Sequence, residues 1–171
     1  MGGDTGMITR KTVGIGSVYA ASGSAELVSY AIGSCIALCL YDPGSGVGAM
    51  AHILLPSGSY TGYANNSIGM RTKYADCALL AALEKMRELG ANPARVQAAM
   101  IGGARMFPHG DVRMMNIGEM NVSSVSMELE KSGIPLLFSQ TGGEKSRTVT
   151  FRIPGVSFDE QIRIKSPQLS M

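Results

Sequence analysis

The sequence predicts an α+β fold in a single domain. Segments with the apolar character of β-strands crowd the first third of the chain, whereas only two stretches show helical periodicity. This uneven distribution argues against the regular strand–helix alternation of a parallel α/β sheet. With 171 residues, of which 45% are hydrophobic and 16% charged, the chain is long enough to bury a core without disulfides or metals.

Four strands are expected before residue 56, because short apolar runs alternate there with Gly-, Ser- and Pro-rich breaks. Their ranges are 11–20, 26–32, 35–41 and 47–55. Asp42-Pro43-Gly44 is a strong turn signal between the last two runs. We therefore expect residues 42–56 to connect two buried strands as a hairpin.

The second half of the chain combines two helices with three further strands. Apolar residues recur every three or four positions over 72–89, and a second helix is expected from Asn116 to about Lys131. Glu119 stands three residues after Asn116, as in a capping box. Strands are expected at 95–101, 134–139 and 147–153. Two long polar loops, 57–70 and 104–115, are expected to border a functional cleft.

The chain ends and the composition bear on location and partners. We expect residues 1–11 to be a flexible tail, 12–155 to be the domain, and 156–171 to be an extension to which no element is assigned. No segment resembles a signal peptide or a membrane span, and the odd cysteine count of three suits a reducing compartment. These features favour a cytoplasmic protein without membrane insertion. A net charge of +2, with both signs interspersed, argues against nucleic-acid binding.

Cys35 is the first candidate for chemistry, because it follows Gly33-Ser34 at the start of an expected strand. A thiol there is either a small core residue or a nucleophile, and a nucleophile needs a base. The chain has two histidines, His52 and His109. We favour His52, because its strand is expected to pair with that of Cys35, whereas nothing ties the loop residue His109 to it. The alternative for His52 is a core histidine with satisfied hydrogen bonds.

Other groups near Cys35 could assist the same chemistry. Ser29 and Ser34 offer hydroxyls, and the backbone amides of residues 34–36 could stabilise an oxyanion. The glycine pair Gly102-Gly103 would allow another strand end to approach the cleft closely. We therefore take Gly33, Ser34, Gly102 and Gly103 as candidate substrate or oxyanion contacts.

No metal or cofactor is expected. Cys35 and Cys39 are four residues apart in a strand, hence about 13 Å apart, which is too far for one tetrahedral zinc ion. Cys77 belongs to the helical pattern of the core. The stretch GIGS at 14–17 lacks the third glycine of a dinucleotide-binding loop, because that position is Tyr19.

Several stretches, in order, resemble the CheD family of chemoreceptor glutamine deamidases, over roughly residues 12–155. They are VGIGS at 13–17, IGSCIALCLYDP at 32–43, GAMAHILLP at 48–56, IGGARMF at 101–107, NIGEMN at 116–121 and TGGEKSRTVTF at 141–151. The combination of GSC, DP and the histidine before LP is specific. The resemblance implies layered β-sheets flanked by helices, as in bacterial toxins that deamidate glutamine.

The resemblance also implies an activity and its residues. Family members are protein-glutamine glutaminases that convert receptor glutamines into glutamate and ammonia, and some also hydrolyse glutamyl methyl esters. Cys35 would be the nucleophile and His52 the base. The family has a threonine that orients the histidine where this chain has Ser29, and often a basic residue where it has Met120. The expected partners are methyl-accepting chemotaxis receptors and a phosphatase of the CheC type.

Two other functions stay open at this point. The Ser29 and Met120 departures would suit a largely non-catalytic chemotaxis regulator that binds the phosphatase or the receptors. A cysteine-dependent hydrolase acting on a different protein glutamine is the other alternative.

Overall fold

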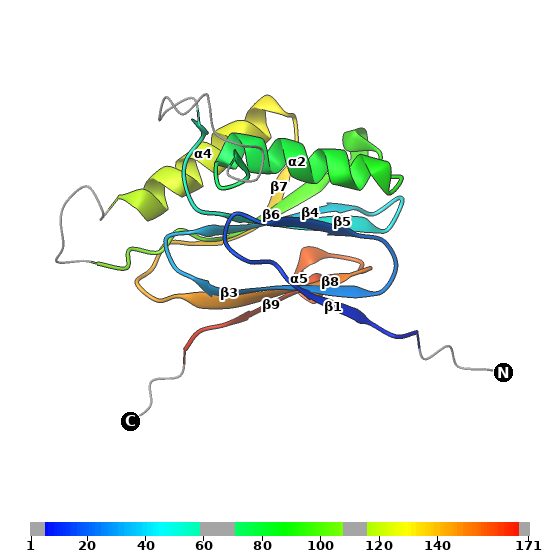
Figure 1. Ribbon diagram of the computed structural model, residues 1–171, viewed down its shortest axis with the longest axis horizontal. Helices are drawn as coiled ribbons and strands as arrows, with labels where there is room; N and C mark the ends of the chain where they lie inside the picture. The colour runs from blue at the N-terminus through cyan, green and yellow to red at the C-terminus, as the bar shows by residue number, and fades with distance from the viewer. Residues whose placement is uncertain (1–5, 59–70, 108–115, 168–171) are drawn as a thin grey trace.

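The computed structural model describes residues 6–58, 71–107 and 116–167 and arranges them in three layers. Helices α2 (Ala75–Glu88) and α4 (Ile117–Lys131) cover one face of a five-stranded sheet. A four-stranded sheet lies against the opposite face (Figure 1). The predicted α+β class is confirmed.

The five-stranded sheet, in the order β2-β5-β4-β6-β7, is the middle layer. Its strands are β2 (Val18–Ala21), β4 (Ile36–Asp42), β5 (Val47–Ile53), β6 (Gln97–Gly102) and β7 (Leu136–Thr141). All neighbours are antiparallel except β6 and β7, which are parallel. Strands β4 and β5 form the predicted hairpin, in which Asp42 lies opposite Val47.

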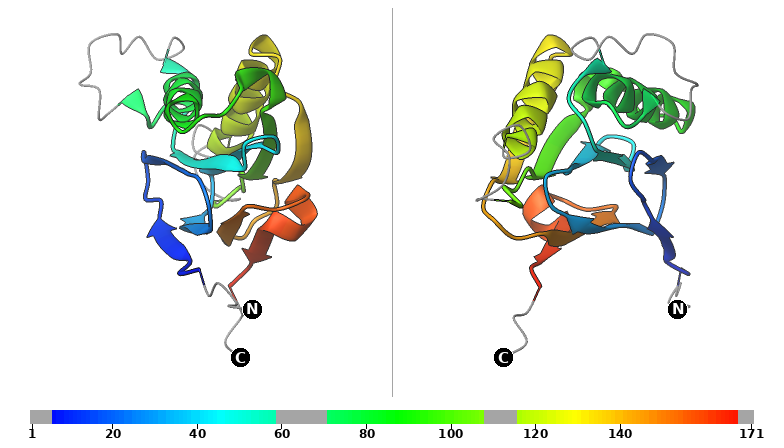
Figure 2. Two further views of the ribbon diagram at one scale, coloured as in Figure 1. Left: turned by 90° about the vertical axis from the view of Figure 1, so that its right-hand side faces the viewer. Right: turned by 60° about the vertical axis from the view of Figure 1, so that its left-hand side comes forward.

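The four-stranded sheet, in the order β1-β3-β8-β9, is the outer layer, and Figure 2 shows it from two further sides. Its strands are β1 (Thr9–Thr12), β3 (Ala25–Ile32), β8 (Arg147–Ile153) and β9 (Ile162–Lys165). Strands β1 and β3 run parallel, and the remaining pairs are antiparallel. A bulge interrupts the β3–β8 ladder between Ser29 and Ile32, just before Cys35.

Strand β4 separates two hydrophobic cores, because successive side chains point to opposite faces. Leu38 and Leu40 pack in the core under the helices, while Cys39 and Tyr41 pack in the core between the sheets. Every residue of β4 and β5 is buried. Because these two strands are covered on both faces, their sequences are continuous apolar runs and do not alternate between apolar and polar residues.

The first strand and the chain ends differ from the expected division of the sequence. The single strand expected at 11–20 is two strands, β1 and β2, which belong to different sheets. Strand β1 begins at Thr9, inside the expected tail. After residue 156 the chain forms the one-turn helix α5 (Phe158–Gln161) and strand β9, which the sequence did not predict. Elements of four residues are too short for a periodic signal.

Smaller differences concern the helices and loops. Asn116 is the N-cap of α4 but makes no side-chain capping bond, and Glu119 instead pairs with Arg105. A 3-10 helix, η2 (Pro93–Arg95), follows α2. Most of the two predicted loops, 59–70 and 108–115, lies outside the described residues. In the part of the chain that the structure describes, no helix is long and apolar enough to cross a bilayer.

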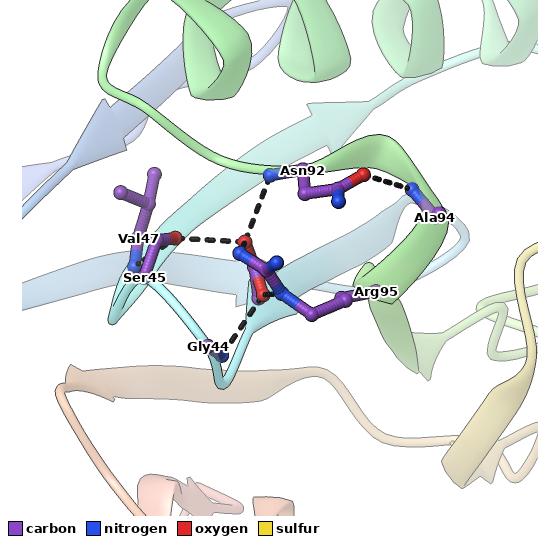
Figure 3. Close-up of polar contacts among 7 residues, drawn as sticks. Gly44, Ser45, Val47, Asn92, Ala94 and Arg95 are labelled. Atoms are coloured by element: carbon purple, nitrogen blue, oxygen red, sulfur yellow. Dashed lines mark hydrogen bonds and ion pairs between the residues drawn. The ribbon is translucent and has the colours of Figure 1, made fainter.

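A buried carboxylate, that of Asp42, ties the β4–β5 turn to the segment that follows α2 (Figure 3). Arg95 donates to both carboxylate oxygens, at 2.8 and 2.9 Å. The backbone N–H of Asn92 donates to the same carboxylate at 2.8 Å. Gly44 N–H and the Ser45 hydroxyl donate two more hydrogen bonds to it. The guanidinium lowers the pKa of Asp42, whereas burial alone would raise it.

Asp42→Asn is expected to lower the free energy of unfolding at pH 7 by on the order of 2–3 kcal/mol, because an ionised acceptor is lost. The folded-state pKa of Asp42 is depressed, so its contribution is complete above the unfolded pKa of about 3.9 and is lost progressively as pH falls from there through the lower folded-state pKa. Urea denaturation at pH 7 and pH 3 measures both effects. Ser45→Ala, which removes one neutral donor, is the matched control; equal losses in the two variants would contradict this account.

Candidate active site

Cys35 and His52 share one face of the central sheet. Cys35 lies directly before β4, and the β4–β5 ladder pairs Ile36 with Ile53 and Ala37 with His52. Cys35 and Ala37 point to the same side because they are two residues apart, and cross-strand partners also share a side. Cys35 and His52 are therefore diagonal neighbours facing the space between the two sheets, as the predicted hairpin required.

The carbonyl oxygen of Val13 orients the imidazole of His52. Nδ1 lies 3.2 Å from this oxygen. Because a carbonyl only accepts, Nδ1 carries the proton and Nε2 keeps a free lone pair. Nε2 is buried and has no hydrogen-bond partner among the described residues. The site thus holds a basic nitrogen on the same face as the thiol.

Burial keeps both groups neutral at rest. It lowers the pKa of His52, an effect that the bond to Val13 partly offsets. It raises the pKa of Cys35, which is 7% exposed, and the backbone N–H of Cys35 itself partly offsets this. The resting pair is therefore a thiol and a neutral imidazole, and the sulfur would have to lose its proton to a base before it could act as a nucleophile.

Ser29, which was expected to orient His52, shares a backbone acceptor with it. Its hydroxyl donates to the Val13 carbonyl at 2.8 Å, and its oxygen lies 3.2 Å from the sulfur of Met50. Val13 therefore receives bonds from both Ser29 and His52. The sequence could not reveal this, because Val13 acts through its backbone and any residue type supplies the same oxygen.

Gly102 and Gly103 contact the backbone of Cys35. Gly103 N–H donates to the Cys35 carbonyl at 2.9 Å, so this amide is engaged with the backbone. A Cβ on Gly102 would lie 2.2 Å from the same carbonyl, and its φ is +126°. Gly102 thus allows β6 to approach the residue that carries the thiol, whereas a Cβ on Gly103 would instead meet Val122 of α4.

The amides of Ser34 and Cys35 remain the candidate oxyanion donors. Among the described residues, neither amide donates to a backbone carbonyl, and the Cys35 N–H interacts with its own sulfur. The carbonyl of Gly33, which precedes these amides, accepts a hydrogen bond from Ala104 N–H at 2.8 Å. A Cβ on Gly33 would lie 2.9 Å from the Met106 sulfur, so this glycine gives room to a neighbouring side chain.

Asn121 is a site residue that the sequence analysis missed. It is fully buried on α4, and its Nδ2 donates to the carbonyls of Ser34, at 2.8 Å, and Leu54, at 3.0 Å. A signal did exist: Asn121 lies four and eight residues before Val125 and Leu129, on the buried face of the helix.

The remaining candidates lie away from this pair. His109 is outside the described residues. Cys77 is on α2, on the other side of the central sheet, and no group of three or more His, Cys, Asp or Glu in the described ranges could hold a metal ion. A groove of about 170 Å³ beside α4 is lined by residues such as Met120 and Met127 but contains neither Cys35 nor His52.

Comparisons with known proteins point to one family. A family model described as CheD chemotactic sensory transduction matches residues 54–158. The chemoreceptor glutamine deamidase CheD of Thermotoga maritima is 38% identical over 144 residues, which are 84% of this chain and 86% of that protein. Two further relatives are named probable chemoreceptor glutamine deamidase CheD. The protein of Desulfitobacterium hafniense strain DCB-2 is 39% identical over 144 residues, which are 83% of this chain and 86% of that protein. The protein of Pyrococcus abyssi is 37% identical over 137 residues, which are 80% of this chain and 82% of that protein.

Gly102→Ala is expected to destabilise the protein more than Gly90→Ala, by about 1–3 kcal/mol. Both glycines have positive φ, but nothing lies within 4 Å of a Cβ on Gly90, whereas a Cβ on Gly102 meets the Cys35 carbonyl. The difference isolates the steric contact from the backbone strain. Urea denaturation of the two variants measures it, and equal losses of stability would show that the close approach at Gly102 is unimportant.

Proposed function

The chain belongs to the CheD family, and on that premise we propose that it is a chemoreceptor glutamine deamidase with Cys35 as nucleophile and His52 as general base. One observation carries the assignment of the two residues. The Val13 carbonyl occupies Nδ1 of His52, so the unpartnered Nε2 is the nitrogen that is free to accept a proton.

The first half-reaction forms a thioester. As Sγ attacks the carboxamide carbon of the substrate glutamine, its proton moves to Nε2 of His52, and the carbonyl electron pair becomes an oxyanion. The amides of Ser34 and Cys35 are the proposed donors to that oxyanion. When the carbonyl re-forms, the C–N bond breaks, and the nitrogen leaves as ammonia with the proton from Nε2.

The second half-reaction restores the thiol. Neutral His52 takes a proton from water as the water oxygen attacks the thioester carbon. Collapse of this second tetrahedral species breaks the C–S bond, and the sulfur regains a proton from Nε2. The products are glutamate and unmodified enzyme. A glutamyl methyl ester would follow the same course with methanol as the leaving group.

The surroundings support this sequence of proton transfers. The imidazolium that forms transiently is stabilised by its Nδ1–H bond to Val13. Ser29, which donates to the same oxygen, helps to hold that carbonyl in place. Because burial lowers the pKa of His52, the imidazole starts neutral and is a competent base at pH 7.

The partners and location are proposed from the family alone. The substrates are methyl-accepting chemotaxis receptors, the protein acts in the cytoplasm, and a CheC-type phosphatase is its regulatory partner. The second candidate function is a largely non-catalytic regulator that binds this phosphatase or the receptors. In its favour, Cys35 is buried with a raised pKa, and the Ser29 hydroxyl donates to Val13 rather than to His52.

Co-expression with a receptor cytoplasmic domain separates these functions by intact-mass analysis. The wild type is expected to add about 1 Da per modified glutamine, and Cys35→Ala is expected to add none. Cys39→Ala is the matched control, since Cys39 lies four residues along the chain, in β4, and is fully buried in the core.

Modification by Cys35→Ala would contradict the nucleophile assignment. An unmodified receptor after co-expression with the wild type would favour the binding regulator.

A further inference from the structure

Asn121 occupies a position that elementary physical chemistry disfavours. It lies on the buried face of α4, with Gly118, Val125 and Leu129. Asparagine is a poor helix former, and burying its amide is costly unless hydrogen bonds compensate. The compensation comes from two backbone carbonyls, those of Ser34 and Leu54, which accept both Nδ2 protons.

These two carbonyls lie where the β4–β5 ladder stops. Ile36 and Ile53 are its last pair at this end. Ser34 is two residues before Ile36 and directly precedes Cys35, and Leu54 directly follows Ile53. The amide of Asn121 therefore bridges the two strand ends just beyond the last ladder pair. On one side it holds the residue before the thiol, and on the other the strand that carries His52.

Only one orientation of the side chain fits this place. Turning the amide over would set Oδ1 against two carbonyl oxygens, all of which only accept hydrogen bonds. In the observed orientation Oδ1 is buried and has no partner among the described residues. The fold thus leaves one buried acceptor unsatisfied while keeping both donors bonded to the strand ends.

We propose that Asn121 is a positioning residue that fixes Cys35 relative to His52 by fastening the Gly33–Cys35 loop to the end of β5. The inference rests on the proposed function of that pair. Asn121 touches neither the thiol nor the imidazole by a hydrogen bond, and it acts through the backbone on either side of them. Removing its donors loosens the loop and widens the range of positions that the sulfur samples.

Two neutral, smaller replacements test this role. Asn121→Ala removes both donors, and Asn121→Ser keeps one. Val125→Ala is the matched control, because it opens a cavity on the same buried face, one turn along α4, without removing a hydrogen bond to the strand ends. Each variant is assayed for deamidation of the receptor domain at a temperature where all are folded, with kcat and KM measured separately.

Alkylation by iodoacetamide gives a second readout that needs no substrate. The modified cysteine is located by peptide fragmentation, and the fully buried Cys39 serves as an internal reference for general loosening. In Asn121→Ala, kcat is expected to fall about 10- to 100-fold, because a small misplacement of the reacting groups slows the reaction by about that factor. A smaller loss of kcat is expected in Asn121→Ser. Cys35 is expected to react several-fold faster while Cys39 does not, and Val125→Ala is expected to keep its kcat.

Several results would overturn the proposal. Wild-type kcat in both Asn121 variants would do so, as would a parallel rise in alkylation of Cys35 and Cys39, or an equal loss of kcat in Val125→Ala. Failure of both Asn121 variants to fold would assign the residue to folding instead. Deamidation by Cys35→Ala would refute the proposed function. Even then, the ratio of Cys35 to Cys39 alkylation would show whether Asn121 restrains the loop that carries Cys35.

Discussion

The hydrogen bond between His52 Nδ1 and the Val13 carbonyl is the interaction on which the candidate site depends. Val13 lies where the chain passes from the outer sheet to the central one, between β1 and β2. Its own N–H donates to Val28 at 2.7 Å, which ties it to β3 of the outer sheet. Further along the same crossing, Gly16 N–H donates to the His52 carbonyl and His52 N–H donates to Ser17. One short segment therefore fixes both the backbone and the side chain of His52.

Layering explains how the proposed catalytic pair can lie inside a stable core. The central sheet is covered by helices on one face and by the outer sheet on the other, so its alternate residues face two separate cores. Cys35 and His52 face the inter-sheet core at one end of the β4–β5 hairpin. At the opposite end of that hairpin, Asp42 is fastened to Arg95 and Asn92. The two ends are thus held by polar contacts, with a continuous apolar centre between them.

The sequence predicted the features that local patterns encode and missed those that depend on distant chain segments. The Asp42-Pro43-Gly44 turn and two apolar runs were enough to pair β4 with β5, and hence to place Cys35 and His52 on one face. Nothing local shows that residues 9–21 divide between two sheets, because the partners β3 and β5 lie elsewhere in the chain. The contact of Val13 with His52 could not be predicted, because it is made by the backbone carbonyl, which every residue type has. Asn121 could have been found, since helical periodicity places this polar residue on a buried face.

The protonation state of His52 tests the central claim most directly. Nitrogen-15 spectra of the two histidines, with His52 assigned through a His52→Gln variant, report which nitrogen carries the proton at each pH. We expect a neutral imidazole at pH 7 with its proton on Nδ1, and a pKa below the ordinary value of 6.5. A proton on Nε2, or an imidazolium at neutral pH, would contradict this claim, because Nε2 could then not accept the proton of Cys35.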